Sequence, residues 1–226
     1  MTRTILFLIF GLAGIALLVS LGVWQMQRLA WKEGILAEIE ARIAAPPVAL
    51  PLDADAEADK YLPVEMTGQF GAGVLRVLVS QKHVGAGYRL ITPFETGGRT
   101  VLVDRGFIRV SAEMPPAPAG QVTVTGNLHW PDDRNSSTPE NDVEGNTWFA
   151  RDIDQMSELF GAEPLLVVAR DLSQSGGAVT PLPVDTSAIP NDHLQYAVTW
   201  FGLAAVWAVM MGYFLFRLRT PAEGDA

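Results

Sequence analysis

Apolar residues dominate the two ends of this 226-residue chain. Thr4 to Gln27 carries no Asp, Glu, Lys, Arg or His over 24 residues, and neither does Leu194 to Phe216 over 23. A helix needs about 20 such residues to cross the roughly 30 Å hydrocarbon layer of a bilayer. The pattern predicts transmembrane helices over residues 4–27 and 193–216 and a tail over 217–226. Everything from Arg28 to Asp192 then lies on one side of the lipid bilayer.

The first helix should continue beyond the membrane. No proline interrupts the chain before Pro46, so the helix is expected to run to about Ile43. Residues 46–60 are rich in Pro, Ala and Asp and have no apolar period, which is typical of a linker. We therefore assign residues 28–60 to a helix extension and linker, and residues 61–190 to a domain between the two spans.

Short β-like runs fill most of that domain. They are rich in Val, Leu, Thr and aromatic residues, and Gly and Pro separate them: Val64–Phe70, Val74–Gln81, Tyr88–Phe94, Val101–Ile108 and Val122–Trp130. One helix is expected after Asp152, a good N-cap, and before Gly161, a helix stop; a last strand should cover Leu165–Ala169. The fold class is a membrane protein with two terminal transmembrane helices and a β-rich (α+β) extracytoplasmic domain, an antiparallel meander or small barrel.

Charge and cysteine content exclude several functions. The net charge is -9, and residues 28–192 hold 13 Lys+Arg against 23 Asp+Glu, which leaves 13 - 23 = -10. Nucleic acid and anionic lipid surfaces call for clustered cations, so neither is an expected partner of the domain. With no cysteine, the chain has no disulfide, thiolate metal site or cysteine nucleophile.

The short flanks of the spans predict the orientation. Arg3 precedes the first span, and Arg217 and Arg219 follow the second, so both termini are expected in the cytoplasm; Arg28 and Lys32 oppose this weakly. The first apolar run is longer than that of a signal peptide and has no small-residue cleavage site. An uncleaved anchor is therefore favoured.

Nothing in the sequence argues for catalysis. The three histidines lack metal-site spacing, and G-x-S-x-G is absent. A membrane-tethered sensor or hydrolase is accordingly the weakest hypothesis, and we expect a protein that is not an enzyme.

His193 is the candidate site residue, because it opens the second span. On a helix it shares a face with Tyr196 and Trp200 and with small alanines. An imidazole above such a face suits a flat, apolar ligand that carries a metal, and haem is such a ligand. Arg28 and Lys32, with Trp24 on the same face of the first helix, could meet its carboxylates.

Simpler interpretations of these residues stay open. Trp and Tyr at a membrane boundary are ordinary anchors, and an imidazole in a first helical turn can face water. Small residues such as Gly11, Gly14, Gly202 and Ala204 indicate helix packing more than a cofactor slot. In Val103–Ile108 the pattern favours a turn with a surface ion pair over a partner-docking edge.

Several segments together resemble the surfeit locus protein 1 family, whose members assist cytochrome c oxidase assembly. The segments occur in the family's order: LGVWQMQRLAWK (Leu21–Lys32), GYRLITPF (Gly87–Phe94), VLVDRGFI (Val101–Ile108), VTGNL (Val124–Leu128), NTWFARDI (Asn146–Ile153) and NDHLQYAVTWFGLA (Asn191–Ala204). The resemblance implies a domain tethered at both ends. It also implies that the haem-linked histidine of the bacterial members corresponds to His193, with Trp200 close by.

The resemblance implies a haem A binding chaperone. It would act on the large haem-bearing subunit of the oxidase in a bacterial plasma (inner) membrane, with the central domain in the periplasm and haem A synthase as a further candidate partner. His193 would ligate the iron, Trp200 and Tyr196 would pack the macrocycle, and Arg28 with Lys32 would offset the propionates. The alternative is an assembly scaffold that holds oxidase subunits and binds no haem.

Overall fold

The computed structural model describes residues 2–82, 84–174, 177–187 and 189–219. These residues divide into two compact units. One combines the chain up to Glu38 with the segment from Ser187 onward, and the other runs from Ile39 to Thr186. Each unit is described by itself.

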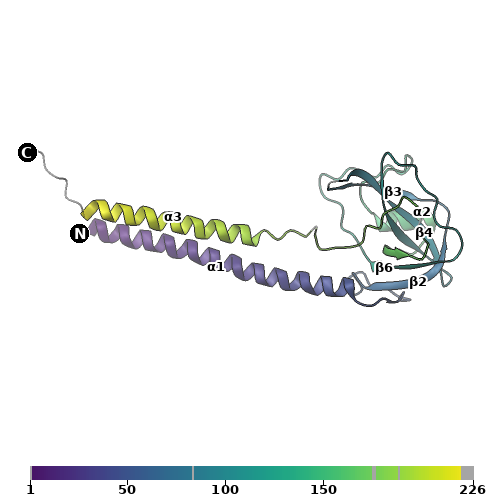
Figure 1. Cartoon of the computed structure of the whole chain (residues 1–226), viewed down its shortest axis with the longest axis horizontal. Helices are drawn as coiled ribbons and strands as arrows, with labels where there is room; N and C mark the ends of the chain where they lie inside the picture. Colours follow the sequence, from purple (N-terminus) through teal and green to yellow (C-terminus); the bar gives the residue numbers. More distant parts are fainter. Residues whose placement is uncertain (1, 83, 175–176, 188, 220–226) are drawn as a thin grey trace, which may run out of the picture. The chain divides into compact units, whose positions relative to one another are not determined.

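Two helices make the first unit. Helix α1 (Thr2–Ala44) and helix α3 (His193–Arg219) are both long and apolar enough to cross a membrane. They lie side by side and antiparallel (Figure 1), with the rings of Phe7 and Phe214 4.5 Å apart between centroids. The predicted extension of the first helix is confirmed, because α1 stays helical to Ala44, just before Pro46 and Pro47.

The second unit is a seven-stranded mixed sheet with one helix. Its elements are β1 (Val48–Ala49), β2 (Pro63–Phe70), β3 (Leu75–Gln81), β4 (Gly85–Thr96), β5 (Arg99–Arg109), β6 (Val122–Leu128), α2 (Ile153–Phe160) and β7 (Leu166–Leu172). All six predicted strands and the predicted helix are present, most of them with ends shifted by a few residues. Asp152 caps α2 and Gly161 ends it in the left-handed conformation, as expected.

The predicted meander is wrong in its strand order. The strands follow the order β1-β2-β6-β7-β5-β4-β3, and β7 runs parallel to β5. A short antiparallel pairing also joins β2 to β4. The strands β2, β6, β7, β5 and β4 therefore form a closed ring, in line with the small-barrel alternative. Gly68 permits this closure, because a Cβ there would overlap the backbone oxygen of Glu95.

The parallel pair β5–β7 is buried on both faces. Val101 and Val103 point into one apolar cluster, which the ring encloses, whereas Leu102 between them points into a second cluster. That second cluster includes Ile153 and Met156 of α2. Strands buried on both sides read as continuous apolar runs, which describes the paired segments Val101–Val103 and Leu165–Ala169.

Polar side chains of the sheet domain donate hydrogen bonds to a backbone carbonyl at the C-terminal end of α1. Asn127 is fully buried in β6 and donates from its amide to the Ile43 carbonyl at 3.1 Å and to the Tyr61 carbonyl at 2.9 Å. Arg170 donates to the same Ile43 oxygen at 2.9 Å. The last carbonyls of a helix have no partner within the helix, so these bonds stabilise its C-terminus.

Candidate functional site

His193 is the first residue of α3 and contacts the other long helix. Its Nδ1 lies 2.8 Å from the amide oxygen Oε1 of Gln25 in α1. Gln25 is 9% exposed and His193 is half-buried. The structure thus pairs the predicted site residue with an amide that the sequence analysis did not single out.

Around this pair the two helices are closely packed. Ala197 and Ala204, on the His193 face of α3, are buried, and Trp200 between them is half-buried. On the α1 side, a Cβ at Gly22 would lie only 2.6 Å from the Phe201 ring. The alanine-bearing face of α3, which the sequence analysis considered for a flat ligand, is therefore covered by helix packing.

Small residues of α1 mark this packing, as predicted. A Cβ on Gly11 would overlap the Met211 side chain, and one on Gly14 would lie 3.2 Å from the Trp207 ring. Gly202 differs from the prediction, since a Cβ there would meet open space.

The remaining predicted site residues lie on the flank of the helix pair. Trp24 is 50% exposed and Tyr196 is 55% exposed. The Arg28 guanidinium stacks on the Trp31 ring at 4.4 Å, and Lys32 is half-buried. Arg28 and Lys32 follow Gln25 by three and seven residues on α1. They therefore share its side of the helix, about 5 and 10 Å farther along the axis.

An apolar hollow lies at the opposite end of the helix pair. It has a volume of about 440 Å³, and Phe7, Phe10, Trp207 and Met210 are among its lining residues. Along α1 it begins some 15 residues from Gln25, about 20 Å. His193 cannot reach a ligand there, and the lining offers no convergent polar groups, so the hollow is typical of a gap that acyl chains fill.

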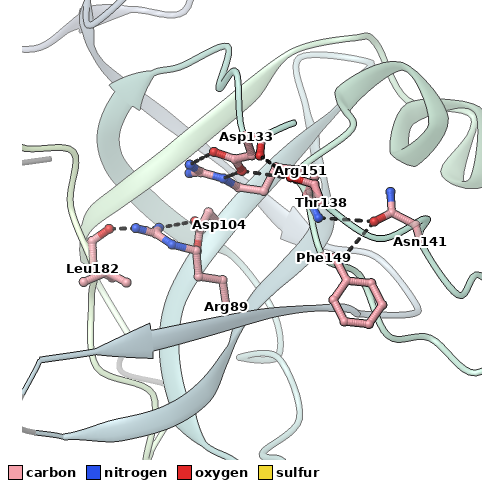
Figure 2. A network of polar contacts seen from close by, with 9 residues as sticks. Arg89, Asp104, Asp133, Thr138, Asn141, Phe149, Arg151 and Leu182 are labelled. Atoms are coloured by element: carbon pink, nitrogen blue, oxygen red, sulfur yellow. Dashed lines mark hydrogen bonds and ion pairs between the residues drawn. The ribbon is translucent and has the colours of Figure 1, made fainter. Parts of the chain in front are cut away.

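Polar groups in the sheet domain form a partly buried network (Figure 2). Arg89 pairs with Asp104 and donates to the Leu182 carbonyl at 3.1 Å. The predicted surface ion pair in Val103–Ile108 is wrong, because Asp104 is fully buried within β5 and its partner is on β4. Arg105 is only 2% exposed. Its one hydrogen bond to a described residue is a long one, 3.4 Å to Pro115 O.

The second part of the network holds the segment before α2. Arg151 binds Asp133 through two bonds of 2.7 and 2.9 Å (Figure 2). Burial alone would raise the pKa of Asp133, but the bonds from Arg151 override it and lower that pKa. The neighbouring Trp148 is fully buried, and Phe149 is half-buried. This arrangement fits a structural clamp, since each charge already has its partner.

His129 lies near this clamp as a neutral imidazole. Its ring stacks on Tyr61 at 5.6 Å between centroids, and its Nδ1 is buried without a partner among the described residues. Burial, with smaller contributions from Arg151 and Lys60, lowers the pKa of His129 from 6.5 to about 4. Charging this ring therefore opposes folding.

In the part of the chain that the structure describes, no three His, Cys, Asp or Glu side chains gather as a metal site would require. A metal bound at His193 would therefore need further ligands of its own, and an iron porphyrin brings them as ring nitrogens. The half-buried imidazole offers the remaining axial donor. His193 is thus the one residue of the predicted site that could hold a haem iron, and Arg28 and Lys32 could meet haem carboxylates.

Two apolar terminal helices flank a mixed β-sheet domain, and this architecture defines a class that is compatible with membrane proteins. Within that class, the family model described as the SURF1 family matches residues 12–205. The match includes Gln25, His193 and the whole sheet domain. The chain belongs to the SURF1 family, whose members are cytochrome c oxidase assembly factors.

Named relatives agree with this assignment. Surfeit locus protein 1 of Mus musculus is 30% identical over 89% of this chain and 73% of the mouse protein. The Xenopus tropicalis protein of the same name is 34% identical over 82% of this chain and 68% of its own length. The Homo sapiens protein is 33% identical over 82% of this chain and 70% of its own length.

Proposed function

We propose that this protein is a haem A binding chaperone that assists haem insertion and assembly of cytochrome c oxidase. The observation that carries the proposal is the placement of His193. The ring stands at the start of an apolar helix, and its Nδ1 bonds Gln25, which leaves Nε2 without a hydrogen bond to any described residue. Such an imidazole is free to bind iron.

The flank of the helix pair supplies what a porphyrin needs besides an axial ligand. Trp24 and Tyr196 present exposed aromatic surface, and Arg28 and Lys32 present cations for carboxylates. Trp200 supports the histidine from within the packed face of α3. Bound haem A would supply the redox-active iron centre that the oxidase requires; this chain's residues bind it, orient it and cover part of it.

The proposal extends to location and partners. The protein would span a bacterial plasma membrane twice, with both termini in the cytoplasm and the sheet domain in the periplasm. Its partner would be the large haem-bearing subunit of the oxidase, with haem A synthase as the source of the haem. The acidic domain, -10 over residues 28–192 from 13 basic and 23 acidic residues, is suited to basic protein surfaces rather than to anionic ones.

The test is the absorption spectrum of the full chain purified in detergent after coexpression with haem A synthesis. We expect a Soret band that His193→Ala weakens at least tenfold, because the iron loses its protein ligand. Gln195→Ala, an exposed neighbour on the same helix, is the matched control and should keep the band. A colourless wild-type protein would reject haem binding, and an unchanged His193→Ala spectrum would reject His193 as the ligand.

A scaffold that binds no haem is the second candidate. It is favoured by the close packing at Gly22 and Phe201, which leaves no slot between the helices, and by the exposed apolar flanks of both helices. A scaffold would purify without colour and still copurify with the oxidase subunit. The same preparation therefore separates the two functions.

A further inference from the structure

Gln25 is the buried polar residue in the apolar helices that calls for an explanation. Among the described residues, the other buried polar or charged side chains all belong to the sheet domain: Thr92, Asp104, Arg105, Asn127 and Ser157. An amide removed from water costs free energy unless it is hydrogen-bonded. Among the described residues, the hydrogen-bond partner of Gln25 is the His193 ring, 168 positions away in the chain and 2.8 Å away in space.

The bond has two chemical forms, and only one leaves His193 able to bind a metal. If the amide oxygen accepts the Nδ1 proton, Nε2 carries a free lone pair. If the amide group turned over and donated to Nδ1, the proton would sit on Nε2 and block it. In the structure the oxygen faces the ring, which corresponds to the first form.

We propose that Gln25 is a positioning residue that holds His193 in the Nδ1-protonated form, so that Nε2 is the iron-binding atom. The inference rests on the proposed haem binding by His193. Metal-bound histidines generally donate their second ring N–H to an oxygen acceptor, which fixes both the tautomer and the orientation of the ring. Gln25 is placed to be that acceptor, and the buried helix contact holds it in position.

The choice of an amide has a consequence for affinity. A carboxylate acceptor would draw the Nδ1 proton more strongly and make the imidazole a stronger iron ligand. A neutral amide orients the ring with less of this effect. Gln25 would thus favour a haem that is held in a defined geometry and can still be released, as a carrier requires.

The first experiment uses the full chain in detergent without haem. Selective ¹⁵N labelling of histidine reports which ring nitrogen carries the proton. In the wild type we expect His193 to be protonated on Nδ1, and in Gln25→Leu we expect a mixture of both forms. Gln27→Leu changes an exposed glutamine two residues farther along α1 and is the matched control, with wild-type signals expected.

The second experiment titrates the same proteins with iron protoporphyrin IX and follows the Soret band and the Raman iron–histidine stretch. We expect Gln25→Leu to bind about 10- to 100-fold more weakly, as loss of such a partner typically does. Gln25→Glu should keep binding and move the stretch to higher frequency. A merely structural role would not produce this opposite pair of effects.

The outcomes separate the inference from the function on which it rests. A wild-type protein that binds no haem would reject the proposed function, whereas unchanged binding by His193→Ala would reject His193 as the ligand and with it the role of Gln25. If His193→Ala loses the haem while Gln25→Leu retains wild-type affinity, stretch and tautomer, haem binding stands and the role of Gln25 is rejected. Should Gln25→Leu not fold, Gln25→Glu decides, since an unshifted stretch would also reject the role.

Discussion

At the scale of single residues, burial distinguishes the polar side chains that are candidates for a site from those that simply face solvent. The sequence analysis selected His193 because an ionisable group at a membrane boundary needs a partner. It missed Gln25, because an amide at the end of an apolar run resembles an ordinary boundary residue. Only the approach of α3 buries that amide, so the signal that identifies it is tertiary.

Two arginines of the sheet domain, one paired with a buried carboxylate and one buried without such a partner among the described residues, should respond differently to the same substitution. Arg89→Met leaves the fully buried Asp104 carboxylate unpaired, and we expect a loss of about 3–5 kcal/mol in the free energy of unfolding. Arg105→Met removes a guanidinium that has no carboxylate partner among the described residues, and burial already lowers its pKa. That variant should be neutral or more stable by about 1–4 kcal/mol.

Urea unfolding of the full chain in detergent, followed by near-ultraviolet circular dichroism, measures both arginine variants. Each serves as the other's control, because the volume change is the same. Equal losses in the two would show that packing, rather than charge pairing, sets their contribution.

His129 should make the stability of the domain depend on pH. Its pKa is about 4 in the folded protein and 6.5 as the ordinary value, so the unfolded chain takes up the proton first on acidification. Stability then rises with pH across this window and falls as pH drops below about 6.5. Between pH 7 and pH 5 the loss should be about 2 kcal/mol.

His129→Phe keeps an aromatic ring against Tyr61 and removes the titrating group. Its unfolding free energy should therefore change less than that of the wild type between the same two pH values, whatever its absolute stability. A variant as sensitive to pH as the wild type would assign the dependence to other groups.

At the scale of elements, local pattern predicted nearly everything except strand neighbours. Pro46 and Pro47 predict the end of α1, and Asp152 and Gly161 predict the start and the end of α2. These predictions succeed because proline and capping residues affect the backbone only within about one helical turn. Burial alternates along the first half of β6, as its residue types indicate, with Val122 and Val124 buried and Thr123 and Thr125 half-exposed. Asn127 departs from this alternation, since it bonds the end of α1.

Strand order was not predictable from the same signals. The run that became β7 comes after α2, yet it pairs between β5 and β6 and runs parallel to β5. Its apolar residues Leu166 and Val167 indicate burial on both faces but do not identify the neighbouring strands. Pairing partners depend on contacts far apart in sequence, which a window of neighbouring residues does not contain.

At the scale of the whole molecule, the two spans and their flanking charges predict a topology that can be tested. A reporter active only in the cytoplasm, fused to either terminus, should be active, and the same reporter inserted in the exposed Gly97–Gly98 turn of the sheet domain should be silent. The physical reason is retention of Arg3, Arg217 and Arg219 on the cytoplasmic side. Activity from the domain insertion would reverse the orientation.

The sequence by itself determined the two long apolar helices, the β-rich domain between them, the extent of its helices and strands to within a few residues, and the candidate histidine at the start of the second apolar helix. These follow from hydrophobic period, caps and residue chemistry, which are local properties. Tertiary structure alone decided that the sheet closes through β2 and β4, that Asp104 is buried against Arg89, and that the space between the helices is filled. It also decided that Gln25 meets His193, because a hydrogen bond between residues 168 positions apart exists only once two helices pack.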